Sequence, residues 1–132
     1  MPVTVDTRFF LTHYLAGTDE LKSKTSRKMV ELQRERAIVP TIVLHDTYKF
    51  TYENFGREVA YLRVNSIMSS NLRIVDLTPK IAVASADLRC HYKGLPTADS
   101  IIAGTCTETK SKRVLSDDAH FKIIREIRAE WF

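Results

Sequence analysis

Three short, mostly apolar runs along the chain are each followed directly by acidic or hydroxyl residues. The runs are residues 3–5, 72–75 and 113–115, and they lead into Asp6, Asp76 and Ser116-Asp117-Asp118. Runs of this length, bounded by polar residues, are typical of β-strands. We therefore expect three strands that each carry a carboxylate near the carboxyl end.

Apolar residues at helical spacing fill the segments between these strands. The helices that we predict span residues 9–15, 22–36, 41–54, 57–70 and 78–92, and a segment that starts at 97 and includes the apolar residues 101–103. Thr78 and Pro79 form a typical helix start, and Thr97 is predicted to cap the next helix. Residues 121–128 are predicted to form a turn or helix, and residues 131–132 an edge strand.

The alternation of strands and helices predicts the fold class. Strands separated by helical segments form βαβ units, which place the strands in a mostly parallel sheet. A chain of 132 residues suits one core, so we expect a single α/β domain over residues 1–132. Ligands of such sheets bind at the carboxyl ends of the strands, which is the edge where the predicted carboxylates lie.

Composition narrows the class of protein without identifying a function. Hydrophobic residues make up 44% and charged residues 27% of the chain, and glycine and proline number four each, which argues against fibrous and low-complexity classes. The net charge of +4 and the pI near 9.2 suit a polyanionic partner, although many basic domains bind none. The apolar runs are too short to cross a bilayer and no signal peptide is recognisable, so we expect a cytoplasmic protein without a membrane contact.

Several chemically capable residues have ordinary interpretations. Cys90 and Cys106 lack the short spacing of a zinc site, so we expect reduced, buried thiols. His45 and His120 are interpreted as packed or exposed residues rather than as bases. Asp76 is interpreted as a turn or capping residue.

The carboxylates suggest chemistry only in combination. A single acid at a strand end is an ordinary loop or capping residue, whereas several that converge repel one another until a cation neutralises them. Oxygen ligands select hard cations such as Mg²⁺ and Mn²⁺, and such an ion can polarise a phosphodiester. Asp99 adds a further acid near a predicted helix start, where the helix dipole favours an anion.

Four segments of the chain carry a resemblance to a known family. They are VTVDTRFFL from residue 3, IVPTIVLHDTYKF from residue 38, LPTADSIIAGT from residue 95 and RVLSDDAHF from residue 113. On these segments the chain resembles PIN domains of the VapC toxin kind over nearly its whole length. The resemblance implies a three-layer α/β/α sandwich with a mostly parallel central sheet.

The resemblance also implies which residues form the site. Its catalytic acids would be Asp6, Asp46, Asp99 and Asp118. Among them, Asp6, Asp99 and Asp118 would hold Mg²⁺ or Mn²⁺. The second acid is usually a glutamate in the family, and Asp46 is one methylene shorter. Glu53, about two helical turns later, is the fallback for that role.

Three neighbours of these acids would support them: Thr7, Ser116 and Asp117. Ser116 represents the hydroxyl of the family motif, which would orient a carboxylate or the attacking water. Asp117 lies directly beside Asp118 and would contact the metal ligands without binding the metal itself.

The function that the resemblance implies is the endonucleolytic hydrolysis of RNA by a metal-dependent ribonuclease. Such a protein would be a VapC-like toxin that forms a homodimer and is silenced by a cognate antitoxin. Two other classes stay open. One is a PIN nuclease of RNA maturation or structured-DNA cleavage outside a toxin system, and the other is a non-catalytic nucleic-acid- or protein-binding module on the same fold.

Overall fold

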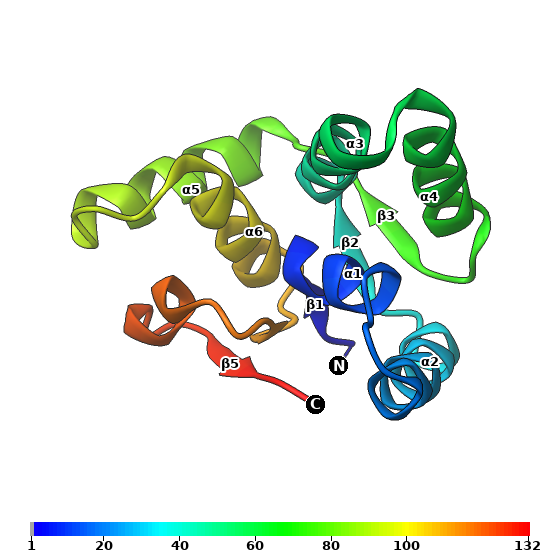
Figure 1. The fold of residues 1–132 in the computed structure, drawn as a ribbon. Coiled ribbons are helices and arrows are strands. Elements are labelled where there is room, and N and C mark those ends of the chain that lie inside the picture. The colour runs from blue at the N-terminus through cyan, green and yellow to red at the C-terminus, as the bar shows by residue number, and fades with distance from the viewer. Residues whose placement is uncertain (1) are drawn as a thin grey trace.

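A parallel β-sheet runs through the centre of the computed structural model, which describes residues 2–132 (Figure 1). Its strands are β1 (Thr4–Val5), β2 (Ile38–Pro40), β3 (Arg73–Val75), β4 (Arg113–Leu115) and β5 (Arg128–Glu130). They lie in the order β3-β2-β1-β4-β5, and each neighbouring pair is parallel. The parallel sheet that the sequence predicts is confirmed.

Within residues 2–132, six α-helices and one 3₁₀ helix surround this sheet. They are α1 (Thr7–Tyr14), α2 (Asp19–Arg34), α3 (Thr41–Phe55), α4 (Arg57–Ser69), α5 (Pro79–His91), α6 (Thr97–Glu108) and the 3₁₀ helix (Ala119–Ile123). Helix α6 packs on β1, β2 and β4 with α5 outside it, whereas α1 and α2 lie on the other side of the sheet (Figure 1). The predicted α/β/α layering is confirmed. None of the helices in this described part is long and apolar enough to cross a membrane.

The core explains why the strands are apolar runs. Val5, Val39 and Val114 come from three adjacent strands and are fully buried, because helices cover both faces of a parallel sheet. Phe9 and Phe10 of α1 are also fully buried, and their rings meet edge to face. The helix that follows β1 is therefore anchored by two aromatic side chains directly after the strand.

The contact between α5 and α6 depends on a glycine. A Cβ atom at Gly104 would lie 3.1 Å from both the Cβ and the backbone nitrogen of Ser85. Such distances are shorter than most real Cβ contacts, so a side chain at this position would push the helices apart. The close packing fixes α6, whose first turn carries Asp99.

Two strands differ from their predictions. Residues Ile38–Pro40 form β2, which the sequence pattern did not reveal because proline is rare inside a sheet. Pro40 is the last residue of the strand and the N-cap of α3, where a missing N–H interrupts little of the ladder. The edge strand is Arg128–Glu130 rather than residues 131–132. The Phe132 ring instead packs edge to face against Phe9, with 5.8 Å between the ring centroids.

Two smaller expectations are also corrected. Thr97 is the first residue of α6 rather than its cap, because Pro96 takes the cap position and its carbonyl accepts the Ser100 N–H. Cys90 is exposed on α5, whereas Cys106 is buried as expected. The thiol of Cys106 contacts the Arg113 carbonyl at 3.4 Å, so it belongs to the packing between α6 and β4.

Candidate metal centre

Asp6 lies where the central strand β1 meets helix α1. Asp6 is only 3% exposed, and its backbone N–H donates to the Leu115 carbonyl of the neighbouring strand at 3.2 Å. The Ser116 hydroxyl donates to Asp6 Oδ2 at 2.6 Å. Burial raises the pKa of Asp6 to about 6 against the opposing effect of the Ser116 hydrogen bond, and the charge of Asp118 adds to the rise. The fold thus holds a carboxyl group that loses its proton at a higher pH than usual.

The turn after β4 connects a second acid to Asp6. The Ser116 hydroxyl that donates to Asp6 also accepts the backbone N–H of Asp118 at 3.0 Å. Asp118 caps the 3₁₀ helix, since its Oδ1 accepts the backbone N–H of His120 at 2.9 Å. The Ser116 hydroxyl therefore holds Asp6, which follows β1, in position relative to Asp118, which follows β4.

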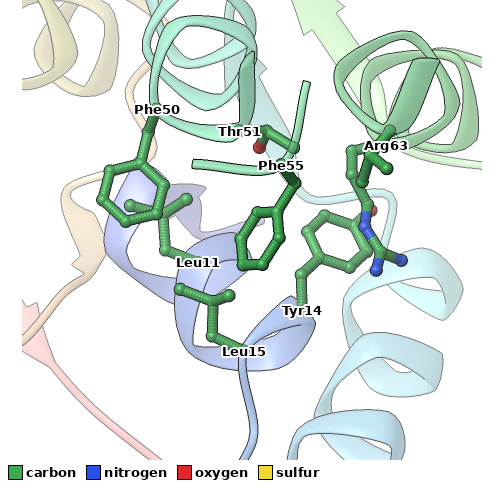
Figure 2. A pocket seen from close by; sticks show the side chains of 8 residues that line it. Leu11, Tyr14, Leu15, Phe50, Thr51, Phe55 and Arg63 are labelled. Atoms are coloured by element: carbon green, nitrogen blue, oxygen red, sulfur yellow. The ribbon is translucent and has the colours of Figure 1, made fainter. Parts of the chain in front are cut away.

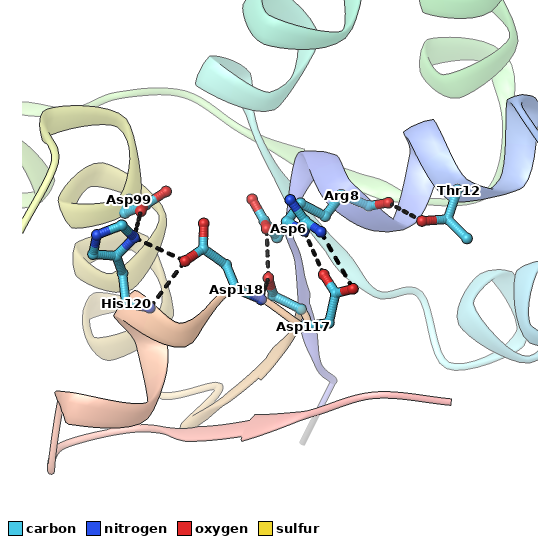
Figure 3. Close-up of polar contacts among 8 residues, drawn as sticks. Asp6, Arg8, Thr12, Asp99, Asp117, Asp118 and His120 are labelled. Carbon is cyan, nitrogen blue, oxygen red and sulfur yellow. Dashed lines mark hydrogen bonds and ion pairs between the residues drawn. The ribbon is translucent and has the colours of Figure 1, made fainter.

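Asp99 brings a third acid to the same place from the first turn of α6. Burial raises its pKa to about 6, and the negative charges of Asp118 and then Asp6 add to the rise. Its side chain is 15% exposed, and its Oδ2 lies 3.2 Å from Nδ1 of His120. The same nitrogen lies 2.8 Å from Oδ1 of Asp118 (Figure 3). One ligand atom each from Asp99, Asp118 and His120 lies within 4.8 Å of the other two.

Asp46 lies at the margin of this cluster. It projects from α3, its side chain is 33% exposed, and its Oδ1 contacts Nδ1 of its neighbour His45 at 2.8 Å. Its charge raises the pKa of Asp99, but this effect is weaker than those of Asp118 and Asp6. The fallback residue Glu53 pairs instead with Lys49 at 2.9 Å, and both of these side chains are well exposed. The assignment of the second acid to Asp46 stays a prediction.

The remaining predicted neighbours behave differently from one another. Ser116 bridges two acids, as described above, whereas Asp117 turns to the guanidinium of Arg8 and forms a two-pronged ion pair with it (Figure 3). That hydrogen-bonded pairing lowers the pKa of Asp117. Thr7 is buried, and its hydroxyl oxygen has no hydrogen-bond partner among residues 2–132.

The donor set of the cluster fits a divalent cation. Asp6, Asp99 and Asp118 supply carboxylate oxygens, which are the ligands of Mg²⁺ and Mn²⁺. The pKa values of Asp6 and Asp99 are raised because burial and neighbouring negative charge disfavour the charged forms of these acids. A bound cation would favour the charged forms of both acids and so offset these two effects.

Two residues of the site were not selected from the sequence. His120 was interpreted as an ordinary histidine, yet it contacts two of the acids. The signal was its position two residues after Asp118, which a capping turn brings onto the same side. Arg8 stands two residues after Asp6, in the first turn of α1, and its guanidinium is more than half exposed beside the cluster.

An apolar pocket lies at the other end of α1. It measures about 80 Å³ and is lined by Leu11, Tyr14 and Leu15 of α1 together with side chains of α3 and α4. Figure 2 shows Phe50 and Phe55 of α3 facing these α1 side chains across it. Phe55 is 53% exposed, so the pocket opens onto a surface of aromatic and aliphatic groups.

Comparison with known proteins gives a family. The sequence profile of the PIN domain matches residues 3–127, whereas no curated protein sequence matches the chain. The structure is similar to VapBC2 from Rickettsia felis bound to a promoter DNA fragment, with 16% identity, a TM-score of 0.81 and coverage of 100% of this chain and 99% of that one. DNA-bound VapBC from Salmonella typhimurium gives 20% identity and a TM-score of 0.78 over 99% and 98% of the two chains.

A third solved structure has the same fold. VapC20 of Mycobacterium tuberculosis, described as a toxin that cleaves the sarcin-ricin loop, gives 15% identity and a TM-score of 0.77 over 96% of this chain and 98% of that one. At identities this low, the likeness to solved structures shows a shared fold. The family rests on the profile match, which covers nearly the whole chain.

Proposed function

The chain belongs to the PIN domain family, and we propose that it is a metal-dependent endoribonuclease of the VapC toxin kind. Membership of the family supports a nuclease in general. The observation that carries the proposal is the convergence of Asp6, Asp99 and Asp118, which are far apart in sequence, at the carboxyl edge of the sheet. Carboxylate oxygens gathered at that edge are the kind of ligand that Mg²⁺ and Mn²⁺ bind.

The residues of the chain have separate tasks in this proposal. A bound Mg²⁺ or Mn²⁺ would polarise the phosphodiester and stabilise the leaving oxygen. Asp6, Asp99 and Asp118 would hold the ion. The Ser116 hydroxyl holds Asp6 and Asp118 in position relative to each other. Asp46 would accept a hydrogen bond from water at the outer side of the cluster.

Arg8 is the residue that we expect to bind the RNA backbone beside the acids. Its guanidinium is exposed, and the ion pair with Asp117 holds it in a fixed direction (Figure 3). A guanidinium can bind a phosphate through two parallel hydrogen bonds. Arg8 would therefore place a phosphodiester close to the acid cluster.

The partners in this proposal are an RNA substrate, a cognate antitoxin and a second copy of the chain. Two of the similar structures are VapBC complexes, which supports an antitoxin. The apolar pocket between α1 and α3 offers aromatic surface for the side chains of such a protein partner (Figure 2). The site of action would be the cytoplasm, where the RNA is found.

One alternative has an observation in its favour. Asp46 has a short side chain that is 33% exposed and contacts His45, which suits a non-catalytic binding module on the PIN fold. A PIN nuclease of RNA maturation or structured-DNA cleavage would share the same acids, and its substrate would separate it from a toxin.

The test is RNA cleavage by the wild type and by Asp99→Asn. The substrates are single-stranded and hairpin RNA, each with Mg²⁺, Mn²⁺ or EDTA. Asp99→Asn keeps the size of the side chain but removes a charge, so we expect cleavage to fall by at least about a hundredfold. Asp87→Asn on the exposed side of α5 is the matched control and should cleave like the wild type. Equal cleavage by Asp99→Asn and wild type would contradict the proposal, whereas RNA binding without cleavage by wild type would favour the binding module.

A further inference from the structure

We propose that His120 is itself a metal ligand, and that its imidazole makes the site prefer transition ions such as Mn²⁺ and Co²⁺ to Mg²⁺. This inference rests on the proposed function, because it requires that the acid cluster binds a divalent ion. It assigns a nitrogen donor to a site that the sequence describes only through carboxylates.

One nitrogen atom of His120 lies close to two of the acids. Nδ1 of His120 lies 2.8 Å from Oδ1 of Asp118 and 3.2 Å from Oδ2 of Asp99 (Figure 3). Ligand atoms of the three residues all lie within 4.8 Å of one another. Donors about 2.0–2.3 Å from a shared ion are separated by at most roughly 4.6 Å. Small rotations of these side chains would therefore bring all three donors around one ion.

The backbone holds His120 in place without help from its ring. The backbone N–H of His120 donates to Asp118 Oδ1 at 2.9 Å, in the turn that begins the 3₁₀ helix. This turn orients both residues toward Asp99. The His120 side chain is 46% exposed, so its ring has room to adjust to an ion.

The imidazole ring of His120 can offer a lone pair to a metal ion. In a neutral imidazole one nitrogen carries the proton and the other carries a lone pair. With the proton on Nε2, Nδ1 becomes a ligand for an ion between Asp99 and Asp118. Imidazole ligands favour transition metals, whereas Mg²⁺ favours oxygen ligands and retains water. The chain thus combines two carboxylates and an imidazole in a set that is less suited to Mg²⁺ than carboxylates alone.

The experiment separates a metal ligand from a residue that only positions the carboxylates. His120→Asn keeps an amide N–H near the place of Nδ1 but removes the imidazole nitrogen. His91→Asn, on α5 and bonded to the Asp87 carbonyl, is the matched control. Pulsed electron paramagnetic resonance of the Mn²⁺-loaded proteins reports nitrogen bound to the ion, and calorimetry gives the affinities for Co²⁺ and Mg²⁺. Thermal unfolding without metal checks that each variant folds.

We expect nitrogen coupling in the wild type and in His91→Asn, and none in His120→Asn. The Co²⁺ affinity of His120→Asn should fall by about tenfold or more, while its Mg²⁺ affinity changes by less than roughly twofold. Mn²⁺ bound without nitrogen coupling in the wild type would overturn the role of His120 and leave the proposed nuclease intact. If the wild type bound no divalent ion at all, the proposed function would fall with it. If His120→Asn did not fold, the wild-type spectrum alone would still decide.

Discussion

Helix α1 connects two regions that depart from ordinary burial in opposite directions. At its start, the polar Asp6 is almost wholly buried among other acids, and at its end Leu15 is 44% exposed beside Phe55 of α3. Burying a carboxyl group and exposing an apolar surface both cost free energy. A bound cation would offset the cost of burying the acids, and an apolar partner would cover the exposed pocket, so we expect the two ends of the helix to suit different ligands.

The two regions also differ in how firmly they are held. Hydrogen bonds of 2.6 to 3.0 Å through Ser116 connect Asp6 to Asp118, and both follow strands of the sheet. The pocket is formed by packing between helices α1, α3 and α4, without such a network among its lining side chains in the described part of the chain. A rigid polar site suits the positioning of a reacting group, whereas a helical apolar surface suits a flexible partner.

The largest expected effect separates the two regions by activity. Asp6→Asn removes a buried ligand charge, and we expect RNA cleavage to fall by at least about a hundredfold. Phe55→Ser changes the pocket at a half-exposed position and should leave cleavage within roughly twofold of wild type, because surface changes seldom disturb the fold. Cleavage rates at saturating Mn²⁺ measure both. A comparable loss in Phe55→Ser would mean that the two regions are not independent.

The second prediction concerns the pH dependence of stability without metal. The folded pKa values of Asp6 and Asp99 are raised from 3.8 to about 6. The protonated forms of these two acids stabilise the fold. This stabilisation is fully present below about pH 4 and is lost as the pH rises through about 6. The loss should be on the order of 2 kcal/mol for each acid. Urea unfolding of the wild type and Asp99→Asn from pH 4 to 7 tests this, and the variant should lose less stability across that range.

A histidine in the same pH window acts with the opposite sign. Burial and the charges of Lys22 and Arg63 lower the pKa of His13 from 6.5 to about 4. The neutral form is favoured in the fold, so its contribution is present above about pH 6.5 and is lost as the pH falls through about 4. The contribution of His13 cancels when the wild type is compared with Asp99→Asn, because both proteins contain this histidine. Parallel stability curves for the two proteins would show that Asp99 ionises normally.

The third prediction adds the cation. Millimolar Mn²⁺ at pH 7 should stabilise the wild type by about 1–2 kcal/mol and raise its melting temperature by several degrees. Phe55→Ser should gain as much as the wild type, whereas Asp99→Asn should gain little. Differential scanning calorimetry with Mn²⁺ or EDTA makes the measurement. An unchanged melting temperature in the wild type would count against a preformed metal site.

The smallest expected effect concerns the margin of the acid cluster. Asp46→Glu extends the carboxylate by one methylene, and we expect metal affinity to rise by about threefold to tenfold, or about 1 kcal/mol. Asp46→Asn is the matched variant that removes the charge and should weaken binding. Calorimetric titration with Mn²⁺ compares the three proteins. If Asp46→Glu binds no more tightly than the wild type, position 46 does not reach the ion.

The sequence by itself determined the fold class and most of the elements. Apolar runs at residues 3–5, 72–75 and 113–115 became β1, β3 and β4. Both residues of the central strand β1 are buried because helices cover the two faces of the sheet, whereas the edge strand β3 is less buried. Local signals worked equally well where they are strong, as at Thr78, whose hydroxyl accepts the Ile81 N–H at the start of α5. The family resemblance added the acids, and the profile match confirms the family.

The tertiary structure alone decided how these acids relate to one another. The joining of Asp6 to Asp118 through Ser116 depends on a hydrogen bond between residues 110 positions apart, and the raised pKa of Asp99 depends on burial and on the charges of Asp118 and Asp6. No local pattern contains such contacts. His120 looked ordinary in the sequence because its contact with Asp99 exists only in the folded chain, and β2 was not predicted because Pro40 ends it. Periodicity reports which side of an element is buried, whereas only the packed sheet decides which side chains meet at its edge.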